Sequence, residues 1–90
     1  MEFEWDEAKR LSNIAKHGID FFRAQSVFDG RPRTELISRR GDEERVVSTA
    51  ELDGRIVTVV WTERRGAIRL ISARGARDAE KREYRSLLER

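Results

Sequence analysis

The stretch that decides the fold is RVVSTAELDGRIVTVVWTE, residues 45–63, because it holds two β-strands and the turn between them. Residues 45–52 alternate in character, and one side of this expected strand comprises Val46, Ser48, Ala50 and Leu52. Asp53-Gly54 is the strongest hairpin signal in the chain, since both residues tolerate the positive φ of a two-residue turn. Residues 56–63 are rich in Val and Ile, as buried strands are. The sequence therefore predicts an antiparallel hairpin here.

Strand signals continue on both sides of this hairpin. A second turn near residues 64–66 leads into an expected strand over residues 67–74. After Pro32, the only proline, residues 34–38 change to a strand-like period. Near the N-terminus, Phe3 and Trp5 alternate with glutamates, which predicts one more short strand.

Three helices are expected around these strands. Asp6 is an N-cap for a helix that runs to about His17, and Gly18 then supplies a left-handed residue that ends it. Asp20 caps a second helix, which Gly30 stops. The two form a compact hairpin. A C-terminal helix is expected from about residue 78 to residue 88, with a small apolar face.

The expected order is strand, helix, helix, four strands, helix. This order predicts an α+β fold with a mostly antiparallel sheet, an N-terminal helix hairpin packed on one face and a C-terminal helix. We expect the helices to be segregated to one face of the sheet. The 90 residues suffice for one domain, spanning residues 1–90.

Composition narrows the function classes. Charged residues make up 40% of the chain, against roughly 25% in an ordinary globular domain, which is typical of a protein that binds a partner or a polyanion. The absence of cysteine excludes disulfides and thiolate metal sites. The longest apolar run, residues 56–61, is too short to cross a bilayer, and the N-terminus is acidic where a signal peptide would be basic. We therefore expect a cytoplasmic protein with no membrane partner.

The positive charge is uneven and dominated by arginine. Residues 64–90 carry nine Lys or Arg against four Asp or Glu, and 16 of the 19 cations in the chain are arginines. Guanidinium groups bind phosphates and carboxylates with paired hydrogen bonds, whereas lysine acts as a point charge. An arginine-rich basic end of the chain indicates phosphate binding, although a basic face that is merely solvated is also common.

Several motifs together resemble the BrnT toxin family. The opening carries them in Phe3-Glu-Trp-Asp-Glu-Ala-Lys9, Asn13-Ile-Ala-Lys-His-Gly-Ile-Asp-Phe21, Ala24 and Val27-Phe28. The second half carries them in Glu44-Arg45, Leu52-Asp-Gly-Arg55, Val59-Val-Trp-Thr62, Ile68-Arg-Leu-Ile-Ser-Ala-Arg74 and a late Tyr84. The resemblance covers nearly the whole chain except about residues 31–42.

This resemblance implies a RelE-like fold and RNA cleavage without a metal or other cofactor. It also implies neutralisation by a BrnA-type protein antitoxin, and repression of the shared operon by the two proteins bound together to operator DNA. The chain departs from the family at Arg39-Arg40, where many relatives carry a histidine, and at Val46, where an aromatic residue is common. The role of a loop histidine therefore does not carry over, and His17 is the only histidine.

Metal-free RNA cleavage needs stabilisation of the extra charge on the phosphate, which arginine clusters supply. We expect Arg45, Arg69 and Arg74 to be catalytic, and Arg64, Arg65 and Arg77 to bind nucleic acid. Arg69 and Arg74 have opposite parity, so they cannot share a face of a regular strand. The structural alternative is that the arginines on the sheet pair across strands with Glu44, Glu51 and Glu63.

His17 is suited to proton transfer. Histidine has an unperturbed pKa of about 6.5, and no other side-chain type in this chain has an unperturbed pKa near neutrality. Its place at a helix C-terminus favours the charged form, so it is either a catalytic group or a cation that satisfies the last carbonyls. Lys16 beside it is either a nucleic-acid contact or a solvated cation.

Tyr84 either takes part in catalysis or anchors the last helix to the sheet, and the two roles are compatible. Trp5 and Trp61 are better interpreted as core residues, because each shares strand parity with apolar neighbours. No metal site is expected. The side chains of the consecutive acidic residues 42–44 do not converge on one point as metal ligands do. A solvated loop is the better interpretation of this run.

Three functions remain open from the sequence. The first is a ribonuclease toxin, the second is a non-catalytic nucleic-acid-binding module that uses the same arginines, and the third is a module that binds only a protein. The motif resemblance favours the first. Cleavage products separate it from the second, and binding to RNA separates both from the third.

Overall fold

The Asp53-Gly54 turn joins two ten-residue antiparallel strands, β3 (Glu43–Leu52) and β4 (Arg55–Arg64). Both turn residues have positive φ, 51° for Asp53 and 84° for Gly54, as the expected type of hairpin turn requires. Seven residues of each strand are paired, from Val46 opposite Trp61 to the turn. The central hairpin is therefore confirmed in this computed structural model, which describes residues 1–90.

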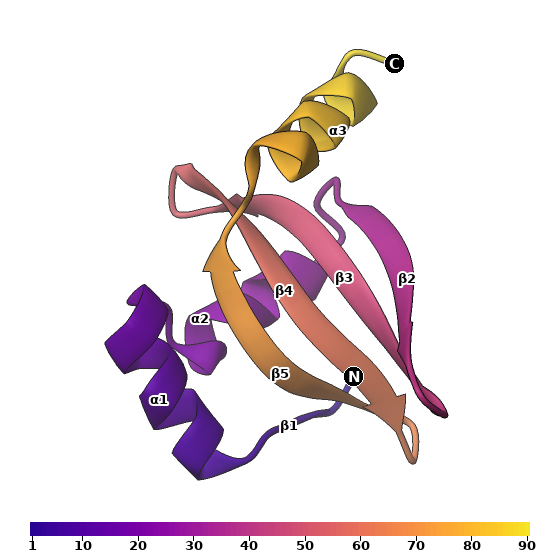
Figure 1. The fold of residues 1–90 in the computed structure, drawn as a ribbon. Coiled ribbons are helices and arrows are strands. Elements are labelled where there is room, and N and C mark those ends of the chain that lie inside the picture. The colour runs from indigo at the N-terminus through magenta and orange to yellow at the C-terminus, as the bar shows by residue number, and fades with distance from the viewer.

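The other strands flank this hairpin and complete a five-stranded sheet in the order β1-β5-β4-β3-β2 (Figure 1). Their bounds are β1 (Phe3–Glu4), β2 (Thr34–Arg40) and β5 (Ala67–Gly75). All strand pairs are antiparallel except β1 with β5, which is parallel. The α+β architecture and the mostly antiparallel sheet are thus confirmed.

Two N-terminal helical segments cover one face of the sheet. Helix α1 (Glu7–His17) begins at the Asp6 N-cap, whose carboxylate accepts from the backbone of Ala8 and Lys9. Helix α2 (Phe21–Ala24) is a single α-turn that continues as the 3-10 helix η1 (Gln25–Phe28). The expectation of a second full helix was wrong in this respect. The segment is held by its apolar side chains against the sheet, and a short tighter turn is sufficient to present them.

The core lies between this face of the sheet and the helices. Its most deeply buried large side chains are Phe21, Val27, Val57, Val59 and Leu70. The two tryptophans pack against the edge of this core, Trp61 edge-on to Phe28 at 5.3 Å between ring centroids and Trp5 edge-on to Phe21. Their assignment to the core is confirmed.

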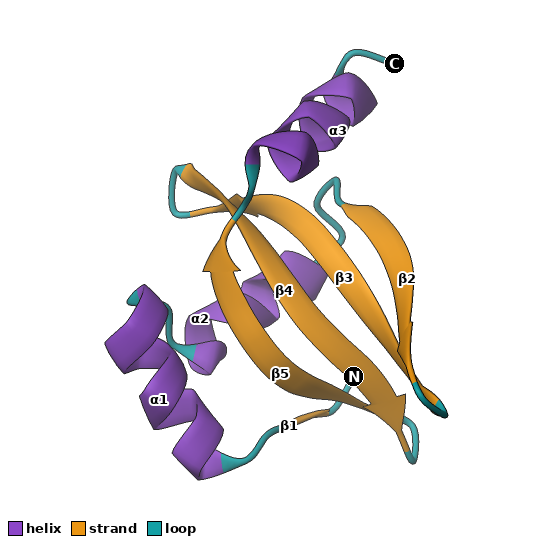
Figure 2. Cartoon of the chain, in the orientation of Figure 1, coloured by secondary structure: helices purple, strands orange, loops and turns teal.

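The C-terminal helix α3 (Asp78–Leu88) lies on the other side of the sheet, which corrects the expectation that all helices share one face. Glu80 of α3 accepts a hydrogen bond from Thr58 of β4 at 2.9 Å. Thr58 stands between Val57 and Val59, so its side chain points away from the core that these valines enter. Figure 2 shows α3 rising from the end of β5, while α2 passes behind the sheet. None of the helices has the length and apolar character needed to cross a membrane.

A buried amide joins α1 to the free edge of β5. The Asn13 side chain donates to the carbonyl oxygens of Ile19 and Ala73 and accepts from the Ala73 backbone N–H, at 2.8, 2.8 and 3.0 Å. Strand β1 pairs only with Ile68 and Arg69, so Asn13 takes the place of a neighbouring strand further along β5. This pairing fixes α1 beside the edge of the sheet.

We expect glycine to be needed at position 18 because of its backbone conformation, and not because a side chain would clash with its neighbours. Its φ is +70°, and a Cβ there would meet no atom within 4 Å. We expect Gly18→Val to lower the free energy of unfolding by about 1–2 kcal/mol, because the left-handed conformation costs that much with a side chain. Thermal unfolding of Gly18→Val beside Gly18→Asn, which tolerates this conformation better, measures the effect. An unchanged melting temperature in the valine variant would show that the helix-stop explanation is wrong.

Candidate nucleic-acid interface

Four arginine side chains line one depression of about 300 Å³ on the sheet face opposite the core. We call it the arginine hollow, and its lining residues are Ser38, Arg40, Arg45, Val47, Val60, Ser72, Arg74 and Arg77. No acidic residue is among them. The arginines come from β2, β3, β5 and the segment between β5 and α3. Segments far apart in the sequence thus bring their positive charge to one place.

The strand register explains this gathering. Val47, Val60 and Ser72 are partners in one row across β3, β4 and β5, and they form the floor. In the next row, Ser38 of β2 lies opposite Arg45 of β3. Side chains in register on neighbouring strands point to the same face, so the small and β-branched floor residues leave room between the longer arginines.

A β-bulge in β5 brings Arg69 and Arg74 to the same face. Val60 pairs with Ser72 and Trp61 with Leu70, which leaves Ile71 as an extra residue without a partner. Arg69 therefore lies opposite Thr62, and Arg74 lies opposite Thr58, on the same side of the sheet. The opposite parity expected from the sequence holds only for a regular strand, and β5 is not regular.

Arg74 is held in place by Glu80. Its two terminal nitrogens donate to the two carboxylate oxygens at 2.8 and 3.0 Å. The same carboxylate accepts from the Thr58 hydroxyl and from the backbone N–H of Arg77 at the start of α3. The Arg74 guanidinium is the main reason that the pKa of Glu80 falls to about 2, and the other two hydrogen bonds add to it. This ion pair fixes one wall of the hollow.

The other arginines leave the hollow positive. The guanidinium groups of Arg40 and Arg77 form no ion pair with a carboxylate, while that of Arg45 meets Glu43 through hydrogen bonds of 3.3 Å. The structural alternative required the candidate arginines to pair with Glu44, Glu51 or Glu63, and none of them does. Glu44 instead forms an ion pair with Arg39. The guanidinium groups of Arg40 and Arg77 are therefore the two in the hollow that no carboxylate neutralises.

A second, smaller basic depression adjoins the first. It measures about 200 Å³, and we call it the α1 depression; its lining residues are Lys9, Ser12, Asn13, Lys16, His17, Ile71 and Ser72. Ser72 lines both depressions, so they meet across β5 at the bulge. The predicted site residues Lys16 and His17 thus lie beside the arginine hollow, at the end of α1, and both are exposed.

Four other predicted site residues lie outside both depressions. Arg69 is on the same sheet face, with Glu4 at 3.7 Å, and Arg64 and Arg65 stand at the turn between β4 and β5. Tyr84 is only 5% exposed and belongs to the buried hydrophobic cluster. This position is the one expected of an anchor for α3, and Tyr84 lines neither basic depression.

Sequence reasoning did not single out Arg40, which the structure places in the arginine hollow. It noted Arg39-Arg40 only as a departure from the resembling family. The signal was present in the alternation of β2, because Arg40 has the parity of Ser38 and so projects from the face of the hollow, whereas Arg39 projects from the opposite face.

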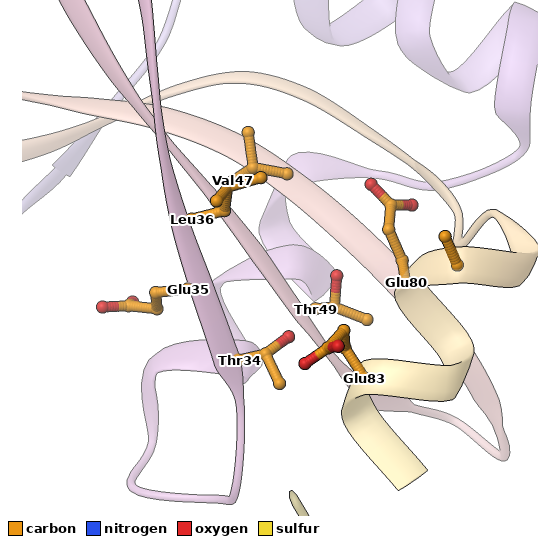
Figure 3. A pocket seen from close by; sticks show the side chains of 8 residues that line it. Thr34, Glu35, Leu36, Val47, Thr49, Glu80 and Glu83 are labelled. Carbon is orange, nitrogen blue, oxygen red and sulfur yellow. The ribbon is translucent and has the colours of Figure 1, made fainter. Parts of the chain in front are cut away.

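A third depression has a different chemistry (Figure 3). It measures about 370 Å³ and lies between β2, β3 and α3. We call it the β2–α3 groove, and its lining residues are Thr34, Glu35, Leu36, Val47, Thr49, Ala79, Glu80 and Glu83. Carboxylates and apolar groups repel or ignore phosphate, so this groove is not the anion site. No three His, Asp or Glu side chains lie together in a way that would hold a metal ion.

The chain is a small α+β protein with a basic hollow on the sheet face opposite its core, and the charge of this hollow is complementary to that of a phosphate. Comparison with protein families gives the particular family. The family described as "Ribonuclease toxin, BrnT, of type II toxin-antitoxin system" matches residues 5–83, so the chain belongs to the BrnT family. No curated protein sequence matches it. Membership makes RNA the implied substrate class and a protein antitoxin the implied partner.

The ion pair of Glu80 should make stability depend on pH in acid. A carboxylate whose pKa is depressed to about 2 stabilises the folded state above its unfolded pKa of about 4.3, and this stabilisation is lost as the pH falls toward 2. We expect Glu80→Gln to be less stable than wild type at pH 7 and the difference to shrink between pH 4.5 and pH 2. Urea unfolding across this range measures it. Glu83→Gln, which removes an unpaired carboxylate of the same helix, is the control, and a constant Glu80→Gln difference at every pH would contradict the role of the pair.

Proposed function

We propose that the chain is a RelE-like, metal-independent endoribonuclease toxin whose arginine hollow holds the scissile phosphate of single-stranded RNA. The observation that carries the proposal is the convergence of Arg40, Arg45, Arg74 and Arg77 on one depression. Membership in a family of ribonuclease toxins supplies the substrate class, and the hollow supplies a place for its phosphate.

The proposed reaction is an internal transesterification. The ribose 2′-oxygen attacks the adjacent phosphorus and loses its proton, the bond from phosphorus to the 5′-oxygen breaks, and that oxygen gains a proton. The products are a 2′,3′-cyclic phosphate and a 5′-hydroxyl. Guanidinium groups fixed around the phosphate stabilise the charge that grows on its oxygens, which is usually the largest catalytic term.

Arg74 is the best-positioned guanidinium for this role, because Glu80 already restricts its orientation. The lining of the hollow contains no histidine and no carboxylate, so we assign proton transfer to a group at its margin. His17 is our candidate, since it lines the α1 depression that meets the hollow at Ser72. Lys16, in the same depression, is proposed to contact a flanking phosphate.

The remaining basic residues extend the proposed RNA track. Arg69 lies on the same face as the hollow, and Arg64 and Arg65 lie beyond it at the β4–β5 turn, where further phosphates would pass. Tyr84 is left out of the proposed chemistry because it is buried elsewhere.

The regulatory part of the proposal follows the family. We propose that a BrnA-type antitoxin neutralises the chain and that the two proteins together repress their operon, with operator DNA bound only through the antitoxin complex. The second candidate function is a non-catalytic nucleic-acid-binding module, which the same positive hollow would serve without cutting.

Single substitutions in the hollow should reduce cleavage without unfolding the protein. We expect Arg45→Ala and Arg74→Ala to lower the cleavage rate by about 10²–10³-fold, the usual cost of removing a group that stabilises transition-state charge. The matched control is Arg82→Ala, which removes an exposed, unpaired guanidinium from α3. Cleavage of a labelled RNA under single-turnover conditions measures the rates, and hollow variants that cut as fast as Arg82→Ala would defeat the proposal. RNA binding without any cleavage by wild type would favour the non-catalytic module.

Cleavage should persist in EDTA. In the proposed mechanism the charge on the phosphate is stabilised by arginine, so removing divalent ions should change the rate by less than about twofold once ionic strength is matched. The measurement is the rate of cleavage with EDTA and with added Mg²⁺. Activity that is lost on chelation and restored by a divalent ion would remove the metal-independent mechanism.

A further inference from the structure

The β2–α3 groove borders the arginine hollow directly. Val47 lines both, with the hollow toward Arg40 and Arg45 and the groove toward α3. The ion pair between Arg74 and Glu80 spans the same boundary, because Arg74 lines the hollow and Glu80 lines the groove. One continuous strip of this sheet face thus changes from positive to apolar and acidic.

The groove offers an apolar surface with one free negative charge. Leu36 is 68% exposed and lies opposite Val47, and Ala79 of α3 faces them from the other wall. Glu80 is occupied by Arg74, whereas Glu83 has no ion-pair or hydrogen-bond partner. Glu35 points away from the other lining side chains (Figure 3), and its carboxylate accepts hydrogen bonds from the Ser48 hydroxyl and the Arg33 guanidinium.

This chemistry fits a protein segment rather than RNA. A phosphate backbone would be repelled by Glu83 and would gain nothing from Leu36, while an apolar side chain would cover a leucine that water now surrounds. Strand β2 is also an edge of the sheet, and Leu36 and Ile37 are two adjacent, exposed apolar residues on it. Natural proteins rarely leave such an edge uncovered.

We infer that one segment of the antitoxin lies across the groove and the arginine hollow together. Its apolar side chain rests on Leu36 and Val47, a Lys or Arg next to it pairs with Glu83, and its carboxylates continue over Arg40 and Arg45. The inference rests on the proposed function, because a segment in this position silences the toxin by occupying the place of the scissile phosphate. The apolar contact supplies affinity, and the charges fix the direction of the segment.

The pair of neighbours Leu36 and Ile37 provides a matched test. Both are exposed to a similar degree, 68% and 60%, and they point to opposite faces of the same strand. Glutamate at position 36 would stand buried and unpaired beneath the segment, whereas glutamate at position 37 would face away from it. Neither residue lines the hollow, so both variants should still cut RNA.

The experiment uses the purified full chain and, as probe, the purified product of the reading frame adjacent to its gene. RNA cleavage is titrated with this probe for wild type, Leu36→Glu and Ile37→Glu. We expect Leu36→Glu to keep its cleavage rate and to need at least about 30-fold more probe for inhibition, the scale of a central interface residue. Ile37→Glu should be inhibited like wild type. Glu83→Arg should also resist inhibition, by about tenfold.

Each other outcome has a definite meaning. Equal inhibition of all three variants would overturn the inference while leaving the ribonuclease proposal intact. Resistance of both Leu36→Glu and Ile37→Glu would indicate a strand added to the β2 edge and would also overturn it. Dimerisation of wild type that Leu36→Glu abolishes, with unchanged inhibition, would assign the groove to a second copy of the chain. Absence of cleavage by wild type would instead refute the proposed function.

Discussion

The bidentate pair between Arg74 and Glu80 connects the sheet, the last helix and the candidate site. Glu80 accepts at once from Arg74, from Thr58 of β4 and from the backbone N–H of Arg77, the N-cap residue of α3. A helix that packs on the sheet with a small apolar face needs such a polar anchor, because burial of Tyr84 alone leaves its orientation open. The same bonds limit the motion of the Arg74 guanidinium. One carboxylate therefore links the position of α3 on the sheet to the orientation of Arg74 in the hollow.

Two local irregularities at the edge of β5 shape the surface around this anchor. The bulge at Ile71 restores Arg74 to the face of Arg69, and Asn13 replaces the strand that would otherwise cover the edge at Ala73. Because Asn13 holds α1 at this edge, the cations of α1 meet the arginine hollow at Ser72. A regular β5 with a full strand beside it would separate the two depressions.

The strands and their turns could be predicted from the sequence because they depend on local signals. Alternation and the Asp53-Gly54 turn specify the central hairpin, and Asp6 and Gly18 specify the ends of α1. The face of the sheet on which α3 packs could not be predicted. It depends on the hydrogen bonds from Thr58 and Arg74 to Glu80, and the Thr58 bond joins segments that are distant in the sequence. The bulge was equally hidden, since Ile71 differs in no local property from a regular strand residue.

The arginines that line the hollow were predicted in part, for the same reason. Arg45, Arg74 and Arg77 were chosen by residue type and position beside the sheet, and the register does bring them together. Arg40 was missed, and Arg64, Arg65, Arg69 and Tyr84 lie elsewhere, because charge and parity do not reveal which strand ends meet.

The central claim is that the arginine hollow binds the scissile phosphate. Its most direct test is the change in the NMR signal of each arginine Nε–H when RNA with a 2′-deoxy cleavage site is added. Binding of the phosphate in the hollow predicts shifts at Arg40, Arg45, Arg74 and Arg77 but not at Arg82 or Arg85, and shifts confined to other arginines would contradict it.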